Sequence, residues 1–129
     1  MSIFTKIING EIPSYKVAED DNFFAFLDIN PNAKGHTLVV PKKEENKIFD
    51  LSKEEYLALM DFSYRVAKAL EKSIPCKRIG MSVIGLEVPH VHVHLIPTNA
   101  MADMQFTKKE KLTNEEFVTL AESISSNFY

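Results

Sequence analysis

The chain has 129 residues, the length of one globular domain and too short for two large ones. Its 45% hydrophobic residues, with only 4 Gly and 6 Pro, supply enough apolar surface for a core and exclude a disordered chain. Fifteen basic residues against eighteen acidic ones give a formal net charge of −3, so no positive excess attracts nucleic acid or an anionic membrane.

The first half of the chain predicts a short helix followed by three strands. Apolar residues at helical spacing over residues 3–8 indicate a short amphipathic helix. Runs rich in β-formers at residues 15–18 and 23–27 flank an acidic hairpin loop. A third strand is expected over residues 36–40, where a proline ends it.

The second half predicts a long helix, two further strands and a final helix. A capping box and a helical apolar stripe indicate a helix over residues 52–72. Strands are expected at residues 79–84 and 90–96, and a second capping box at residues 113–116 starts a C-terminal helix. The pattern favours an α+β fold in which a five-stranded antiparallel sheet carries one long helix and short N- and C-terminal helices on one face.

Cysteine content and hydropathy bear on where the chain acts. The single Cys76 cannot form a disulfide within the chain, and the start lacks the features of a signal peptide. No apolar run reaches the roughly 18–20 residues that cross a bilayer. We therefore expect a cytoplasmic protein without a membrane partner.

Three of the four histidines alternate with apolar residues. On a strand His90, His92 and His94 would project from one face, because successive side chains alternate. Burying three imidazoles requires a partner for every ring nitrogen, which disfavours a purely structural role. Two chemistries remain open: a metal site that uses two histidines of one face, and nucleophilic attack on phosphorus through a covalent phosphohistidine.

The segment His-Val-His-Val-His-Leu-Ile at residues 90–96 resembles the signature of the histidine triad (HIT) superfamily of nucleotide hydrolases and transferases. Residues 3–13, 26–31 and 35–42 are similar, in the same order, to the Hint branch. The resemblance implies a single HIT-like domain over residues 1–129, with residues 101–129 as a less typical C-terminal extension. It also implies a homodimer that joins the long helix and a strand edge of each subunit.

The resemblance implies an enzyme that cleaves nucleoside 5′-phosphoramidates or related α-phosphate derivatives to a purine nucleoside monophosphate, without a cofactor or a metal. His92 would attack the α-phosphorus and form a nucleotidyl-histidine, while the backbone carbonyl of His90 orients its ring. His90 would also hydrogen-bond toward His36, which completes the set. His94 would contact phosphate oxygens and help the leaving group depart.

Further site residues follow from the same resemblance. Asp28 corresponds to a ribose-binding carboxylate, and an apolar clamp around the base would comprise Ile3, Phe4, Ile7, Phe26 and Ile29. Leu86 and Glu87 replace two phosphate-facing donors of the Hint pattern, and we expect Glu87 at the margin of the nucleotide site. Some bacterial relatives carry a zinc-binding Cys-x-x-Cys where this chain has Ser2 and Thr5, so that metal site is expected to be lost.

Three alternative functions stay open at this point. Within the superfamily, the chain could cleave diadenosine polyphosphates. It could also be a nucleotide-binding regulatory module with little turnover, because two phosphate donors are replaced. The third alternative is a metal-dependent hydrolase, for which the paired histidines would be ligands.

Overall fold

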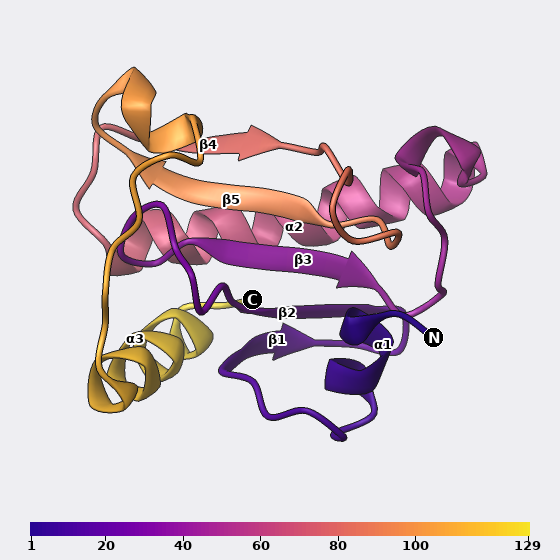
Figure 1. Cartoon of the computed structure of the whole chain (residues 1–129), viewed down its shortest axis with the longest axis horizontal. Coiled ribbons are helices and arrows are strands. Elements are labelled where there is room, and N and C mark those ends of the chain that lie inside the picture. Colours follow the sequence, from indigo (N-terminus) through magenta and orange to yellow (C-terminus); the bar gives the residue numbers. More distant parts are fainter.

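Five antiparallel strands form one sheet in the computed structural model, which describes residues 1–129 (Figure 1). Across the sheet the strands are β1 (Lys16–Glu19), β2 (Phe23–Leu27), β3 (Thr37–Pro41), β5 (Val93–Thr98) and β4 (Arg78–Ser82). The helices are α1 (Ile3–Ile8), α2 (Lys53–Ser73) and α3 (Asn114–Ser126), with short 3₁₀ turns η1 (Ile48–Asp50) and η2 (Met101–Met104). The expected α+β fold is confirmed.

The long helix begins and ends where its sequence signals lie. The Ser52 hydroxyl accepts a hydrogen bond from the Glu55 N–H at 3.1 Å, and the Glu55 carboxylate accepts one from the Ser52 N–H at 2.9 Å. This reciprocal pair satisfies two of the donors that a helix start leaves free. No helix of the chain has both the length and the apolar character that a membrane crossing needs.

The sheet is buried on both faces. Alternate residues of β2, Phe23 and Leu27 among them, pack against α2 and α3 in the larger core cluster. Phe24 and Phe26 point the other way and meet Phe4 of α1 in a smaller cluster. The expectation that all helices cover one face is therefore wrong for α1. All five residues of β2 are apolar and buried, so the strand needs a cover on its second face as well.

The strand that carries the histidine motif starts later than expected. Residues 90–92 lie outside the strand, and β5 pairs with β3 only from Val93, opposite Val39. Pro89 has no N–H to donate, and the His90 N–H donates within a local turn to the Val88 carbonyl at 2.8 Å. His90 and His92 thus lie just before the strand, where their backbone carbonyls are free to contact side chains.

Candidate active site

The four histidines gather on the α1 side of the sheet, and all are buried. The Phe4 ring lies edge-on to His90 and His92, at centroid distances of 5.7 and 4.9 Å. The His94 ring is 4.9 Å from the His92 ring and 5.3 Å from the His36 ring. Because every ring nitrogen in such a cluster needs a suitable partner, the partners fix where each proton sits.

His90 is held by two partners that define its tautomer. Its Nε2 lies 2.8 Å from the Pro41 carbonyl oxygen, which can only accept, so Nε2 carries the proton. Its Nδ1 then accepts the hydroxyl proton of Ser2 at 2.6 Å. Burial lowers the pKa of His90 and keeps the ring neutral. The expected hydrogen bond from His90 toward His36 is wrong, because both nitrogens of His90 are engaged elsewhere.

His92 is oriented by the backbone of the first histidine. Its Nδ1 donates to the His90 carbonyl oxygen at 2.8 Å, as the family resemblance implied. In the neutral ring the proton therefore sits on Nδ1, and Nε2 holds an unshared electron pair. This is the arrangement that a nucleophilic imidazole requires.

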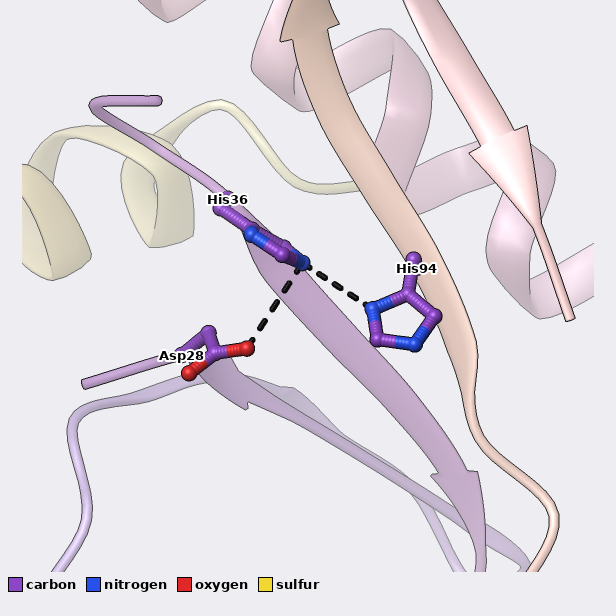
Figure 2. A group of neighbouring side chains, drawn as sticks. All are labelled: Asp28, His36 and His94. Carbon is purple, nitrogen blue, oxygen red and sulfur yellow. Dashed lines mark hydrogen bonds and ion pairs between the residues drawn. The ribbon is translucent and has the colours of Figure 1, made fainter. Parts of the chain in front are cut away.

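His36 and His94 form a directed hydrogen-bonded pair (Figure 2). The Asn32 N–H donates to His36 Nδ1 at 3.0 Å, so the proton of neutral His36 lies on Nε2. That Nε2–H donates to His94 Nδ1 at 3.0 Å, which leaves the His94 proton on its own Nε2. Burial, reinforced by neighbouring charges, lowers the pKa of His36 to about 3 and that of His94 to about 4. Both rings are neutral at pH 7.

Asp28 follows the end of β2 and lies beside this pair. Its Oδ2 is 3.7 Å from His36 Nε2, and its Oδ1 accepts the Asn30 N–H at 2.9 Å. The side chain keeps 20% of its surface exposed, and burial raises the pKa of its carboxyl. Asp28 can therefore still accept a hydrogen bond from a ligand hydroxyl.

Asp28, His36 and His94 also have the composition of a metal site, since their nearest ligand atoms lie within 4.8 Å of one another (Figure 2). A metal there needs the electron pair of His36 Nε2, which moves the His36 proton to Nδ1. Nδ1 would then point its proton at the Asn32 N–H, a repulsive contact of two donors. The partners of His36 fit a hydrogen-bonded relay better than a metal centre.

A cleft of about 330 Å³ opens beside His92 and His94. Its lining includes Leu86 and Glu87 from the loop between β4 and β5, and Phe106 and Lys109 from the segment after η2. The last two come from the C-terminal extension, and the sequence analysis missed them. No spacing pattern links them to the histidine motif, because only the fold of the chain after β5 brings them there.

The five expected base-binding residues differ in their burial. Phe4 and Phe26 are buried with ring centroids 5.7 Å apart, and Ile7 packs against their cluster. Ile3 and Ile29 are exposed. None of the five lines the cleft of His92 and His94, although Phe4 contacts His92 directly. Glu87 is exposed and does line the cleft, as its expected position at the margin implies.

Comparisons with known proteins agree with this geometry. The family model described as HIT domain matches residues 9–101. An uncharacterised HIT-like protein of Methanocaldococcus jannaschii is 46% identical over 107 residues, 75% of this chain and 78% of the relative. The adenosine 5′-monophosphoramidase of Saccharomyces cerevisiae is 42% identical over 96 residues, 74% of this chain and 61% of the yeast protein.

A solved structure extends the similarity to nearly the whole chain. The crystal structure of a Hit-like protein from Bartonella henselae, described as involved in cell-cycle regulation, superposes with a TM-score of 0.84 at 32% identity. The match covers 98% of this chain and 96% of the other. With the motif, the fold and the matched family model in agreement, the chain belongs to the HIT family.

Proposed function

We propose that the protein hydrolyses nucleoside 5′-phosphoramidates, or related α-phosphate derivatives, to a purine nucleoside monophosphate through a nucleotidyl group on His92. The observation that carries the proposal is the 2.8 Å hydrogen bond from His92 Nδ1 to the His90 carbonyl, because in the neutral ring it puts the proton on Nδ1 and fixes the direction of the electron pair on Nε2. The yeast relative named adenosine 5′-monophosphoramidase supports this choice of substrate class.

The first step forms a bond between His92 Nε2 and the α-phosphorus while the phosphorus–nitrogen bond of the substrate breaks. The electron pair of that broken bond stays on the departing amine nitrogen. The substituted imidazole now carries a positive charge, and the His90 carbonyl at 2.8 Å stabilises it through the Nδ1 proton. This contact grows stronger as the charge develops, which is how an enzyme lowers a barrier.

The second step returns the enzyme to its starting state. A water oxygen attacks the phosphorus, the bond to His92 Nε2 breaks, and its electron pair returns to the ring. The hydroxyl part of the water ends on the nucleoside monophosphate, and the remaining proton balances the one taken up by the amine. The net reaction consumes one water and needs no other reactant.

His94 acts in this scheme as a hydrogen-bond donor. With a pKa of about 4, its ring is neutral at pH 7, and losing the Nε2 proton would create an unfavourable imidazolate. Its Nε2–H, directed by His36, therefore stays on the ring and points to a phosphate oxygen or to the leaving nitrogen. The proton that the amine requires enters from the open cleft.

The nucleoside end of the substrate is assigned to Asp28 and to the apolar residues near α1. The half-buried carboxylate of Asp28 accepts hydrogen bonds from ribose hydroxyls. The base would bind among Ile3, Phe4, Ile7, Phe26 and Ile29. A flat apolar contact of this kind gives affinity with little discrimination between purines.

We further propose a cytoplasmic homodimer. β4 is an edge strand, and Met81 on it is 55% exposed. The neighbouring α2 exposes Leu57 and Tyr64. Pairing this edge with a second copy would satisfy free backbone groups and cover apolar side chains.

The direct test is to incubate the purified protein with adenosine 5′-phosphoramidate and with diadenosine polyphosphates and to follow AMP release. We expect faster AMP release from the phosphoramidate, at a rate that EDTA does not lower. We also expect an adenylyl adduct on His92 in intact-mass spectra recorded under alkaline conditions. Preferred cleavage of the dinucleotides would favour the first alternative. Tight AMP binding without turnover would favour the regulatory module, and activity lost together with bound zinc would favour a metal-dependent hydrolase.

A further inference from the structure

The segment that follows β5 folds back against the histidine site. It passes through η2 and residues 105–112 and then enters α3, beside the loop that joins β2 to β3 (Figure 1). Buried Asn32 of that loop holds it with both ends of its amide: Nδ2 donates to the Asp103 carbonyl at 3.0 Å, and Oδ1 accepts from Lys109 Nζ at 2.7 Å. The Glu110 N–H donates to the Pro31 carbonyl at 2.8 Å. Three hydrogen bonds thus fix the segment to the loop that leads to His36.

Phe106 packs against the hydrogen-bonded pair of His36 and His94. Its ring lies edge-on to His94 at 4.8 Å and to His36 at 6.1 Å. Its backbone has a φ of 60°, the left-handed conformation that side chains other than glycine seldom adopt. Lys109 Nζ lies 5.2 Å from the centre of the same ring, over its face. Asn32 and Phe106 together therefore hold the ammonium group at the rim of the cleft.

Lys109 is the only cationic side chain among the residues that line this cleft, and Glu87 is the only acidic one. The neutral ring of His94 offers the phosphate little positive charge. Leu86 and Glu87 supply neither a hydroxyl nor an amide on the loop between β4 and β5. Lys109 is therefore the one lysine or arginine of this cleft that can supply a counter-charge to a phosphate beside His92.

We propose that Lys109 binds a phosphate oxygen of the nucleotide, with Asn32 holding its ammonium group in place. Only one of its three N–H bonds is used by Asn32, so two can reach an anion. The C-terminal extension thereby becomes part of the nucleotide site. This inference rests on the proposed function, because it takes the ligand of the cleft to be a nucleotide.

The test measures binding instead of turnover. Isothermal titration would compare AMP with adenosine, two ligands that differ in the phosphate alone, on the wild type and on Lys109→Gln. We expect Lys109→Gln to weaken AMP binding by roughly tenfold, the usual loss for one charge-assisted hydrogen bond, and to leave adenosine binding unchanged. The difference in AMP affinity between the wild type and Lys109→Gln should shrink at high salt, because a partly exposed ion pair is screened.

Lys108→Gln is the matched control, since it removes the same charge one residue earlier from an exposed side chain that does not line the cleft. It should bind both ligands as the wild type does. The inference is overturned if Lys109→Gln binds AMP normally, if it loses adenosine and AMP equally, or if the wild type binds no AMP. Binding of AMP that depends on Lys109 without any phosphoramidase activity would refute the proposed function and leave the inference standing.

Discussion

Ser2 and His90 are 88 positions apart in the chain and are joined by a buried hydrogen bond of 2.6 Å. The same Ser2 hydroxyl accepts the Thr5 N–H at 3.1 Å and so caps α1. Glu44 ties the arrangement to the end of β3, because its Oε1 accepts from the Ser2 N–H and from the Thr5 hydroxyl, both at 2.6 Å. The start of the chain thus holds the histidine whose carbonyl orients His92.

Removing this hydroxyl should disturb both stability and the orientation of His92. For Ser2→Ala we expect a loss of about 1–2 kcal/mol in the free energy of unfolding, because a helix cap and a buried hydrogen bond disappear together. The value of kcat should fall severalfold. Ser2→Thr keeps a hydroxyl and should recover most of both losses. Equal kcat for Ser2→Ala and the wild type would show that Ser2 only caps the helix.

The sequence predicts the strands and the capped helices well, because their signals are local. A run of β-forming residues identifies β2, and helical apolar stripes with two capping boxes identify α2 and α3, to within a residue or two. The partners of the histidines could not be predicted in the same way. The Ser2–His90 contact depends on which face α1 covers, and the pairing of His36 with His94 depends on the register of β3 against β5.

Local sequence patterns also could not predict that the C-terminal extension supplies residues to the cleft. Phe106 and Lys109 reach the cleft because Asn32 binds the segment, and a single buried asparagine in a loop gives no sign of its partner in the sequence. By contrast, the hydrogen bond from His92 to the His90 carbonyl spans two residues. The resemblance to the HIT superfamily implied it before the fold was known.

Replacing His92 by alanine should abolish turnover and preserve nucleotide binding. The substitution removes the nucleophile but leaves Asp28 and Lys109 in place, so kcat should drop by several orders of magnitude while the Kd for AMP stays close to that of the wild type. His94→Ala should be milder, since it removes one hydrogen-bond donor. If His92→Ala kept more than about a tenth of the wild-type kcat, a change of only ~1.4 kcal/mol in activation free energy, the nucleophile would be another group.

Stability should fall on mild acidification because His36 and His94 are buried as neutral rings. Their pKa values, about 3 and about 4 in the folded protein, lie below the ordinary 6.5, so the unfolded chain binds more protons at pH 5. Each histidine should therefore remove about 2 kcal/mol from the free energy of unfolding between pH 7 and pH 5. Asp28 has the opposite effect on the free energy of unfolding: burial raises the pKa of its carboxyl, so its protonation in the folded protein favours folding as the pH falls.

Urea unfolding of the wild type and of His36→Gln at both pH values checks this. The variant should be less stable at pH 7 and should lose less stability on acidification, because one of the two depressed titrations is gone. Parallel pH dependence in the two proteins would mean that His36 titrates normally in the folded state.

The proposed dimer is tested at its strand edge. Met81→Glu places a charge on exposed β4 without touching the core, so it should convert a dimer into a monomer in sedimentation velocity at tens of micromolar. Met101→Glu is the control, because Met101 is another exposed methionine, at 80%, and lies on η2 away from the strand edge. Sedimentation of the wild type itself at 14.7 kDa would refute the dimer.

Glu87 is the only acidic residue among those that line the cleft, and its role there is the least obvious. An ionised carboxylate about 5 Å from a phosphate charge would cost on the order of 3 kcal/mol at an effective dielectric near 20. The exposed side chain can avoid much of that cost by turning into solvent. Lys109 lines the same cleft and supplies the opposite charge. We therefore predict that Glu87 lies at the margin of the site, without an essential part in the chemistry.

On this interpretation Glu87→Ser should leave kcat within about tenfold of the wild type, or raise it by restoring a hydroxyl beside the phosphate. The pH profile of kcat should keep its shape. Glu87→Gln separates the two effects, since it removes the charge without adding a hydroxyl, and it should tighten AMP binding slightly. A loss beyond about a hundredfold, ~2.7 kcal/mol, together with a missing acidic limb in the pH profile, would instead make Glu87 a proton-transferring group of the reaction.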